Sequence, residues 1–297
     1  MRKKIQEYFA VVLLLGLVSG SAANVNGQSV SRQAVGAGRA AYADINGIRM
    51  YYEVHGKAKG IPLVLLHGGG STIDVTFSKV LPAFAANRPV IAIEEQGHGR
   101  TSNRDKPVRF ESSADDVAAL LKLLKIEKAD IFGFSNGASV AMQVAIKHRS
   151  LVRKLVFASA ATRRDGAHPL LWRFIEESTL SNMPQPLKDA FLKVNPDPEK
   201  LRVMFEKDRE RMLNFKDVPD ADVKSIQAST LILIGDKDIV KPEHAVELTR
   251  LIPKSRLLIL PAGHGDYLGE AVTTTRKTNY PELTVGLIEE FLNLPPE

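Results

Sequence analysis

The stretch "DIFGFSNGASVAMQVAIKH", from Asp130 to His148, carries the pattern that decides the fold of this 297-residue chain. Its first part is a short apolar run typical of a buried strand, and its second part repeats small and apolar residues at helical spacing. Between the two parts, Ser135 is flanked by Gly133 and Gly137 in a G-x-S-x-G pattern. Side chains at the two glycine positions would crowd a sharp turn from strand to helix. Since such a turn holds a hydroxyl clear of the backbone, we predict that Ser135 is a catalytic nucleophile.

Short apolar runs similar to the first part recur along the chain and alternate with helical stretches. They lack regular polar alternation, which is typical of strands buried on both faces of a mostly parallel sheet. The first two runs flank the turn residues Asn46 and Gly47 and predict a hairpin. The alternation predicts an α/β fold with a doubly wound, mostly parallel, eight-stranded sheet. The eight runs are "YADI", "IRMYYEVHG", "PLVLLHG", "PVIAIE", "ADIFGF", "KLVFAS", "STLILIG" and "RLLILP".

The alternation is interrupted between residues 161 and 226 by a stretch with helical periodicity, several prolines and no convincing strand. We expect a helical cap insertion here, and because ligands bind beyond the carboxyl ends of parallel strands, the cap would cover the pocket. The alternative is a surface decoration. "KDRERM", residues 207–212, is expected to be a solvated helical face. Five apolar residues are expected to pack the cap against the core, with an acyl pocket as the alternative: Leu170, Leu171, Trp172, Phe174 and Ile175.

A serine nucleophile needs a base, and the base needs an acid that orients it. His264 in "LLILPAGHGD" follows the last apolar run between two glycines, so it projects from a loop at a strand end; the other six histidines fit this role less well. Asp236 and Asp238 follow the preceding apolar run. We favour Asp238, with Asp236 as the alternative, which gives the chain order Ser135, Asp238, His264.

The glycines of "LLHGGGST", Leu65 to Thr72, allow backbone N–H groups to approach a ligand closely. We predict that the N–H groups of Gly69 and Asn136 form the oxyanion hole, with Gly70 as the alternative to Gly69. His67 is expected to shape this loop. The segment lacks the Lys-Ser/Thr of a phosphate-binding loop, and the chain has no dinucleotide fingerprint.

With these motifs, the chain after its first 41 residues resembles the serine hydrolases of the α/β-hydrolase fold, the esterase and lipase-like superfamily with a helical cap. The resemblance implies that the histidine-glycine stretch forms part of the oxyanion hole and that a cap follows the sixth strand. It also implies an acid three residues after the glycine that ends its strand, which is Asp238 after Gly235. "EEQGHGRTS", residues 94–102, resembles the family's D-x-R-G-x-G-x-S turn but has Glu94 and Gln96 in place of aspartate and arginine, which weakens assignment to a known subgroup.

Composition excludes several other classes of protein. The basic residues that give a formal net charge of +6 are dispersed, and no aromatic-basic motif accompanies them, so no nucleic-acid partner is expected. The absence of cysteine excludes disulfides, thiolate metal sites and a cysteine nucleophile. The serine chemistry needs neither a metal nor an organic cofactor, and we expect none.

The N-terminus has the pattern of an export signal: "MRKK", then the apolar "FAVVLLLGLVSG", then the small residues of "SAAN". We predict a signal peptide over residues 1–23, cleaved after Ala22 or Ala23, a flexible linker over 24–41, and a hydrolase domain over 42–297. The apolar run is shorter than the ~20 residues of a spanning helix, so an uncleaved membrane anchor is the alternative. A periplasmic or secreted protein without stable membrane insertion is expected.

Together these features predict an exported serine hydrolase that cleaves a carboxylic ester or lactone of a small molecule through an acyl-enzyme. A peptidase of the iminopeptidase kind, a hydrolase of carbon-carbon bonds beside a ketone, an acyltransferase and a slow-turnover ligand sensor remain alternatives on the same residues. Fold relatives that open epoxides or displace halides are expected to have an aspartate where Ser135 stands.

Overall fold

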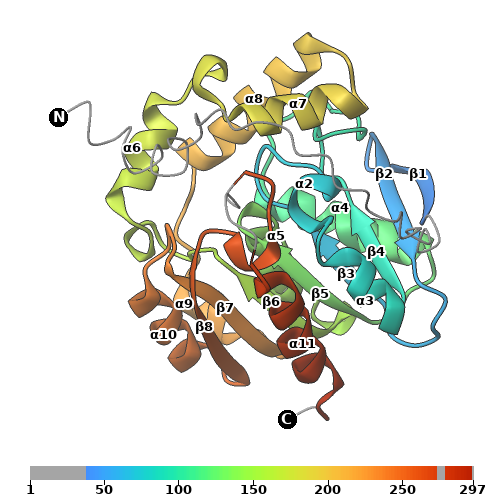
Figure 1. The fold of residues 1–297 in the computed structure, drawn as a ribbon, viewed down its shortest axis with the longest axis vertical. Helices are drawn as coiled ribbons and strands as arrows, with labels where there is room; N and C mark the ends of the chain where they lie inside the picture. Colours follow the sequence, from blue (N-terminus) through green and yellow to red (C-terminus); the bar gives the residue numbers. More distant parts are fainter. Residues whose placement is uncertain (1–37, 273–277, 296–297) are drawn as a thin grey trace, which may run out of the picture. The chain divides into compact units, whose positions relative to one another are not determined.

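The computed structural model describes residues 38–272 and 278–295. Within this part of the chain, eight strands form one sheet in the order β1-β2-β4-β3-β5-β6-β7-β8 (Figure 1). The β1–β2 and β2–β4 pairs are antiparallel, and the other neighbours are parallel. The prediction of an eight-stranded, mostly parallel sheet is therefore confirmed. The strands are β1 (Arg39–Ile45), β2 (Ile48–His55), β3 (Leu63–Leu66), β4 (Val90–Ile93), β5 (Ala129–Phe134), β6 (Val152–Ala158), β7 (Ser229–Lys237) and β8 (Ser255–Gly263).

Helices cover both faces of the sheet. One face packs on α4 (Phe110–Leu123), α5 (Asn136–Lys147), α9 (Asp220–Lys224) and α10 (Pro242–Leu251). The other face packs on α2 (Ile73–Phe77), α3 (Leu81–Asn87) and α11 (Tyr280–Asn293). The sheet is thus doubly wound, as predicted.

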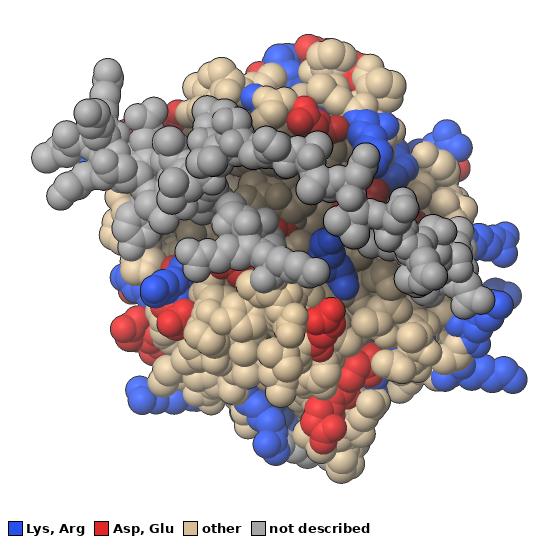
Figure 2. All heavy atoms as spheres, viewed as in Figure 1, with Lys and Arg blue, Asp and Glu red and all other residues tan. Residues whose placement is uncertain are grey.

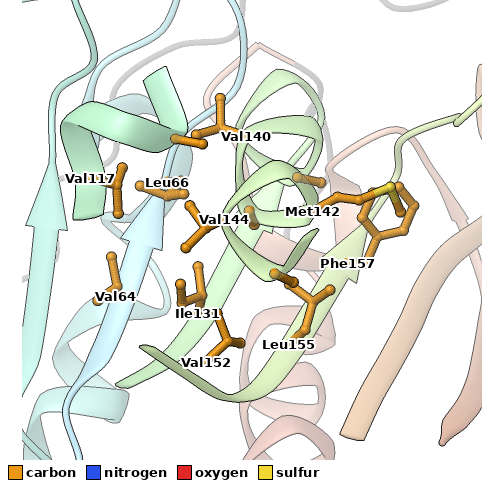
Figure 3. Close-up of a cluster of buried hydrophobic side chains, with 14 of the residues drawn as sticks. Val64, Leu66, Val117, Ile131, Val140, Met142, Val144, Val152, Leu155 and Phe157 are labelled. Carbon is orange, nitrogen blue, oxygen red and sulfur yellow. The ribbon is translucent and has the colours of Figure 1, made fainter. Parts of the chain in front are cut away.

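The two cores explain the continuous apolar runs of the sequence. In β5, Ala129 and Ile131 belong to the core under α5, whereas Phe132 and Phe134 belong to the core under α3 and α11. Figure 3 shows the first of these cores, in which side chains of β3, β5 and β6 meet those of α5. Because both alternate sets of side chains are buried, neither set is polar.

The chain between β6 and β7 carries the helices α6 (Pro169–Glu177), α7 (Gln185–Val194), α8 (Pro198–Leu213) and α9. Figure 1 shows α6, α7 and α8 grouped together at one end of the sheet. These helices contain a small apolar cluster of their own, separate from the two sheet cores, that includes Met183, Phe191, Leu201 and Met204.

One strand boundary differs from that expected. The first strand begins at Arg39, and not at Tyr42, because backbone pairing with β2 continues to the Arg39–Val54 pair, where side-chain hydrophobicity gives no signal. Helix α4 begins at Phe110, and the Ser112 hydroxyl in its first turn accepts a hydrogen bond from the N–H of Arg109. The predicted signal peptide, residues 1–23, and the linker up to residue 37 lie outside the described residues.

The surface of the described residues carries both signs of charge. Figure 2 shows basic and acidic side chains interspersed over the face that it draws. Among the described helices, none is long and apolar enough to cross a membrane.

Candidate active site

Ser135 occupies the turn between β5 and α5 with φ 54° and ψ −122°, a strained conformation for a residue with a side chain. The two neighbouring glycines are required by space. A Cβ at Gly133 would lie 2.2 Å from the carbonyl oxygen of Gly137, and a Cβ at Gly137 would lie 2.2 Å from the carbonyl oxygen of Leu66. The backbone N–H of Ser135 donates to the carbonyl of Ala158 at 2.9 Å. The turn therefore presents the hydroxyl at the N-terminus of α5, where the helix dipole favours negative charge.

The structure brings the predicted base and acid to this hydroxyl. His264, directly after β8, has Nε2 at 3.2 Å from the Ser135 Oγ and Nδ1 at 2.8 Å from the Asp238 Oδ1. Asp238 is buried just beyond β7, whereas the alternative acid, Asp236, is exposed. The arrangement suits proton transfer from serine to histidine, and the catalytic roles of the three residues stay a prediction.

Asp238 and His264 each stabilise the charged form of the other. Burial lowers the pKa of the His264 imidazole, but the carboxylate of Asp238 outweighs it, so that the pKa is raised above its ordinary value. Burial likewise raises the pKa of the Asp238 carboxyl, and the interaction with His264 reverses this to a net lowering. Asp238 is therefore ionised at neutral pH and stabilises a protonated His264.

Ser159 and Tyr267, which sequence reasoning did not select, complete the surroundings of Asp238. The Ser159 hydroxyl donates to Asp238 Oδ2 at 2.5 Å and lies 2.5 Å from the Tyr267 hydroxyl. A hydroxyl has one proton, so Tyr267 is the donor to Ser159. Both residues are buried, and Ser159 has a strained φ of 54°. The signal available for Ser159 was its place directly after a strand, the position that also holds Ser135.

The predicted oxyanion donors, on the loop after β3 and at the first residue of α5, line the same cavity. Gly69 and Asn136 both border it, together with Ser135. Gly70 also borders it, but its N–H donates to His98 Nε2 at 3.2 Å. No hydrogen bond within the described residues engages the N–H of Gly69 or of Asn136. This difference favours Gly69 over Gly70 as a donor to a substrate.

His67 is buried at the base of this loop. Its Nδ1–H donates to the carbonyl of Gly68 at 2.8 Å, and its Nε2 accepts the N–H of Glu95 at 3.2 Å. Burial lowers the pKa of this imidazole to about 4, so it is neutral. These contacts match the expected loop-shaping role of His67.

The expectation of a solvated face at residues 207–212 is wrong. Arg211 of α8 is buried and bonds to Asp208 on one side and, at 3.0 Å, to Glu95 Oε2 on the other. The Asp208 Oδ1 also accepts from the side chain of Asn136 at 3.3 Å. Asp208 and Arg211 follow the buried Met204 by four and seven residues, so both lie on the apolar face of their helix. Charged residues at the helical spacing of the buried apolar residues were the signal that could have revealed the cluster of Asp208, Arg211 and Glu95.

A cavity of about 230 Å³ lies between Ser135 and the helices of the cap. Most of its wall is apolar, and its charged lining residues are Asp208 and Arg209. Four of the five cap residues expected to pack only against the core line this cavity instead, because α6 turns one side toward the nucleophile. The cap residues Leu171, Trp172, Phe174, Ile175, Met204, Phe205 and Phe215 contribute to the wall.

Within residues 38–272 and 278–295, no group of three or more His, Cys, Asp or Glu side chains is arranged to hold a metal ion.

Comparison with known proteins points to one family. The model of the family described as alpha/beta hydrolase fold matches residues 61–214. The 2-hydroxy-6-oxo-2,4-heptadienoate hydrolase of Pseudomonas putida is 28% identical over 230 residues, which cover 69% of this chain and 82% of that protein. The 2-hydroxymuconate semialdehyde hydrolase of Pseudomonas sp. (strain CF600) is 26% identical over 257 residues, covering 73% and 90% of the two chains.

Solved structures agree with this match at the level of the fold. The enol-lactonase from Burkholderia xenovorans LB400 superposes with a TM-score of 0.67 at 19% identity, over 86% of this chain and 100% of that one. The two Pseudomonas relatives named above are hydrolases.

Proposed function

Because this chain belongs to the α/β-hydrolase fold family, we propose that it is a serine hydrolase that cleaves a carboxylic ester or lactone of a small molecule. The observation that carries the proposal is the continuous path from Asp238 through His264 to the strained Ser135, with separations of 2.8 and 3.2 Å. A buried serine hydroxyl without such a path is a poor nucleophile.

In the proposed reaction, His264 Nε2 takes the proton of the Ser135 hydroxyl as its oxygen attacks the carbonyl carbon of the substrate. The N–H groups of Gly69 and Asn136 stabilise the oxyanion. The alcohol departs with the proton from His264 and leaves an acyl-enzyme. A water molecule, deprotonated by His264, then releases the acid and restores Ser135.

The size and wall of the cavity support a small, apolar acyl group. A cavity of 150 Å³ lined by apolar side chains binds benzene in another protein, so about 230 Å³ accommodates an acyl group somewhat larger than a benzene ring. The aromatic side chains of Trp172, Phe174 and Phe215 favour a flat or branched apolar tail.

Hydrolysis of a carbon-carbon bond beside a ketone is the second candidate. The name of the Pseudomonas putida relative gives a 6-oxo acid as its substrate, a compound without an ester. The same nucleophile and oxyanion donors would serve this reaction. Acid release from a matched pair separates the two: an alkyl ester and the corresponding 1,3-diketone, whose cleavage expels a stabilised enolate that takes up the proton. Cleavage of the ester alone supports the first proposal.

Labelling with a fluorophosphonate probe tests the nucleophile without knowledge of the substrate. We expect one adduct, on Ser135, found by peptide mass spectrometry. Labelling should be absent in Ser135→Ala and slowed strongly in His264→Ala, because the base is lost. Ser139→Ala is the matched control, since Ser139 lines the same cavity one turn into α5 and should leave labelling unchanged. A folded protein that does not label at Ser135 would refute the proposal.

A further inference from the structure

The carboxylate of Asp208 lies at the oxyanion end of the cavity. It comes from α8 of the cap and reaches the two segments that carry the proposed oxyanion donors. Its Oδ1 accepts from the Asn136 side chain at 3.3 Å, and a Cβ built on Gly69 would lie 2.7 Å from its Oδ2. A substrate carbonyl bound to Gly69 and Asn136 would therefore have Asp208 as a neighbour.

Two carboxylates and one guanidinium meet beside this end of the cavity. Asp208 and Glu95 share the single guanidinium of Arg211. Burial raises the pKa of the Asp208 carboxyl, but the Arg211 guanidinium outweighs it and keeps the carboxyl ionised. His98 also faces Asp208: its Nε2 lies 3.7 Å away and accepts the N–H of Gly70. Burial lowers the pKa of His98, but the Asp208 carboxylate outweighs it and raises the pKa above its ordinary value. His98 can become charged and donate to Asp208 only at the expense of that hydrogen bond.

One oxygen of Asp208 retains capacity to accept hydrogen bonds. Arg211 and Asn136 both donate to Oδ1. The neighbours of Oδ2 are the Asn136 Nδ2 at 3.5 Å and the His98 Nε2 at 3.7 Å, both beyond the usual length of a good hydrogen bond. A carboxylate oxygen has two lone-pair directions, so a donor on a bound substrate would find Oδ2 open.

An ionised carboxylate at this place opposes the developing oxyanion unless a donor or a cation lies between them. We infer that Asp208 determines specificity by accepting a hydrogen bond from a hydroxyl or ammonium group of the acyl moiety, carried within two bonds of the scissile carbonyl carbon. This inference rests on the proposed hydrolysis at Ser135. The apolar wall beyond Asp208 then receives the rest of the acyl chain. Acyl groups with a carboxylate at the same position are rejected, because two anions would share one apolar cavity.

A panel of four methyl esters with one carbon skeleton tests the inference. The parent is methyl 3-phenylpropanoate, and the other three carry at carbon 2 a hydroxyl, an ammonium or a carboxylate group. We expect kcat/KM for the hydroxyl and ammonium esters to exceed that of the parent by about 10- to 100-fold, as for a hydrogen bond to a charged group. The carboxylate ester should be the slowest. The ranking of the hydroxyl ester against the ammonium ester tells whether the site favours a neutral or a cationic donor.

Two variants assign the preference to Asp208. Asp208→Asn keeps the shape and an oxygen acceptor but removes the charge, so the advantage of the ammonium ester should be lost and the carboxylate ester should gain. Glu210→Gln is the matched control: Glu210 lies on the exposed side of the same helix and is not part of the cavity wall, so the ranking of esters should persist. The rate of fluorophosphonate labelling at Ser135 reports whether each variant keeps a folded, activated site.

The outcomes separate this inference from the proposed function. A wild-type protein that labels at Ser135 but shows no preference for the donor-bearing esters, or cleaves none of them, overturns the role of Asp208. A preference for the ammonium ester that survives in Asp208→Asn, or disappears equally in Glu210→Gln, overturns it as well. Failure of Ser135 to label in the wild-type protein refutes the proposed function itself.

Discussion

At the scale of single residues, His264 links the geometry to the pH dependence of the proposed reaction. Only the neutral imidazole accepts a proton from Ser135, so kcat/KM should rise as pH increases through the pKa of His264 in the free enzyme. Asp238 raises that pKa above the ordinary value of a histidine, against the effect of burial. We therefore expect the acid limb of the profile to have its midpoint above pH 6.5, measured with an ester whose own ionisation lies outside the range. A midpoint well below 6.5 would contradict an ionised Asp238 beside the base.

Ser159 gives a second prediction at this scale, as a residue that positions the acid. Loss of its hydroxyl removes one donor from Asp238 Oδ2 and concentrates the negative charge on Oδ1, toward His264. The acid limb of kcat/KM should then move to higher pH, and the value at pH 7 should fall by about 3- to 10-fold, the range of one lost hydrogen bond. Because the φ of Ser159 is 54°, Ser159→Gly removes the hydroxyl without adding backbone strain.

Ser159→Ala provides the comparison, because it removes the same hydroxyl but keeps a Cβ at the strained position. Equal movement of the pH profile in the Gly and Ala variants assigns the effect to the hydrogen bond. Tyr267→Phe should move the profile in the same direction by less, since Tyr267 acts on Asp238 through Ser159. A profile that stays in place in all three variants would show that Ser159 has only a packing role.

At the scale of secondary-structure elements, Gly137 controls how closely α5 approaches β3. The Cβ of Gly137→Ala would lie 2.2 Å from the carbonyl oxygen of Leu66 and 2.4 Å from that of His67. Backbone atoms of a central strand cannot move aside at low energetic cost. We therefore expect the free energy of unfolding to fall by about 1–3 kcal/mol, as for other overpacked cores. Fluorophosphonate labelling should slow as well, because the strand carries the oxyanion loop. Denaturant unfolding measures the first effect.

Gly286→Ala is the matched control for this substitution. Gly286 lies on the exposed side of α11, and a Cβ there would meet no atom within 4 Å. The variant should leave labelling unchanged and raise stability by about 0.5–1 kcal/mol, the usual gain of alanine over glycine within a helix. Equal losses of stability in the two variants would contradict the steric argument for Gly137.

The elements also show what the sequence could predict and why. Strands buried on both faces, such as β3, β4 and β5, produce uninterrupted apolar runs and were visible as local patterns. The edge strands β1 and β8 are partly exposed. Ser135, Asp238 and His264 were selected because each directly follows a strand, where side chains meet at the carboxyl edge of the sheet. The start of β1 was missed because Arg39 pairs through its backbone alone.

Local sequence patterns could not identify contacts between side chains from distant segments of the chain. Asp208 and Arg211 are charged, and exposure is the common state of charged residues, so "KDRERM" was interpreted as a solvated face. Their burial depends on Glu95 and Asn136, which lie on other segments more than 70 residues away. Glu94, one of the two departures from the family's turn, has a role within the turn itself. It is buried and accepts the N–H of Arg100 at 2.6 Å, which stabilises the turn.

At the scale of the whole molecule, we propose that the chain is exported, and the proposal rests on its first 23 residues. The described part contains the complete proposed site, so nothing before residue 38 is needed for the chemistry. Expression of the full chain in a bacterial host with a general secretory pathway should yield a shortened protein outside the cytoplasm. Its N-terminus should be Ala23 or Asn24, read by mass spectrometry of the mature form, since small residues precede both bonds.

Replacement of Ala22 and Ala23 together by glutamate should abolish cleavage and leave a longer form attached to the membrane, because charged residues are excluded next to the cleaved bond. Deletion of residues 1–23 should retain the protein in the cytoplasm and leave the rate of Ser135 labelling unchanged. A full chain that is exported but keeps its first residues would favour an anchor over a cleaved signal. A full chain that stays in the cytoplasm would refute export, and with it the expectation of a substrate outside the cytoplasm, while leaving the proposed reaction at Ser135 as it stands.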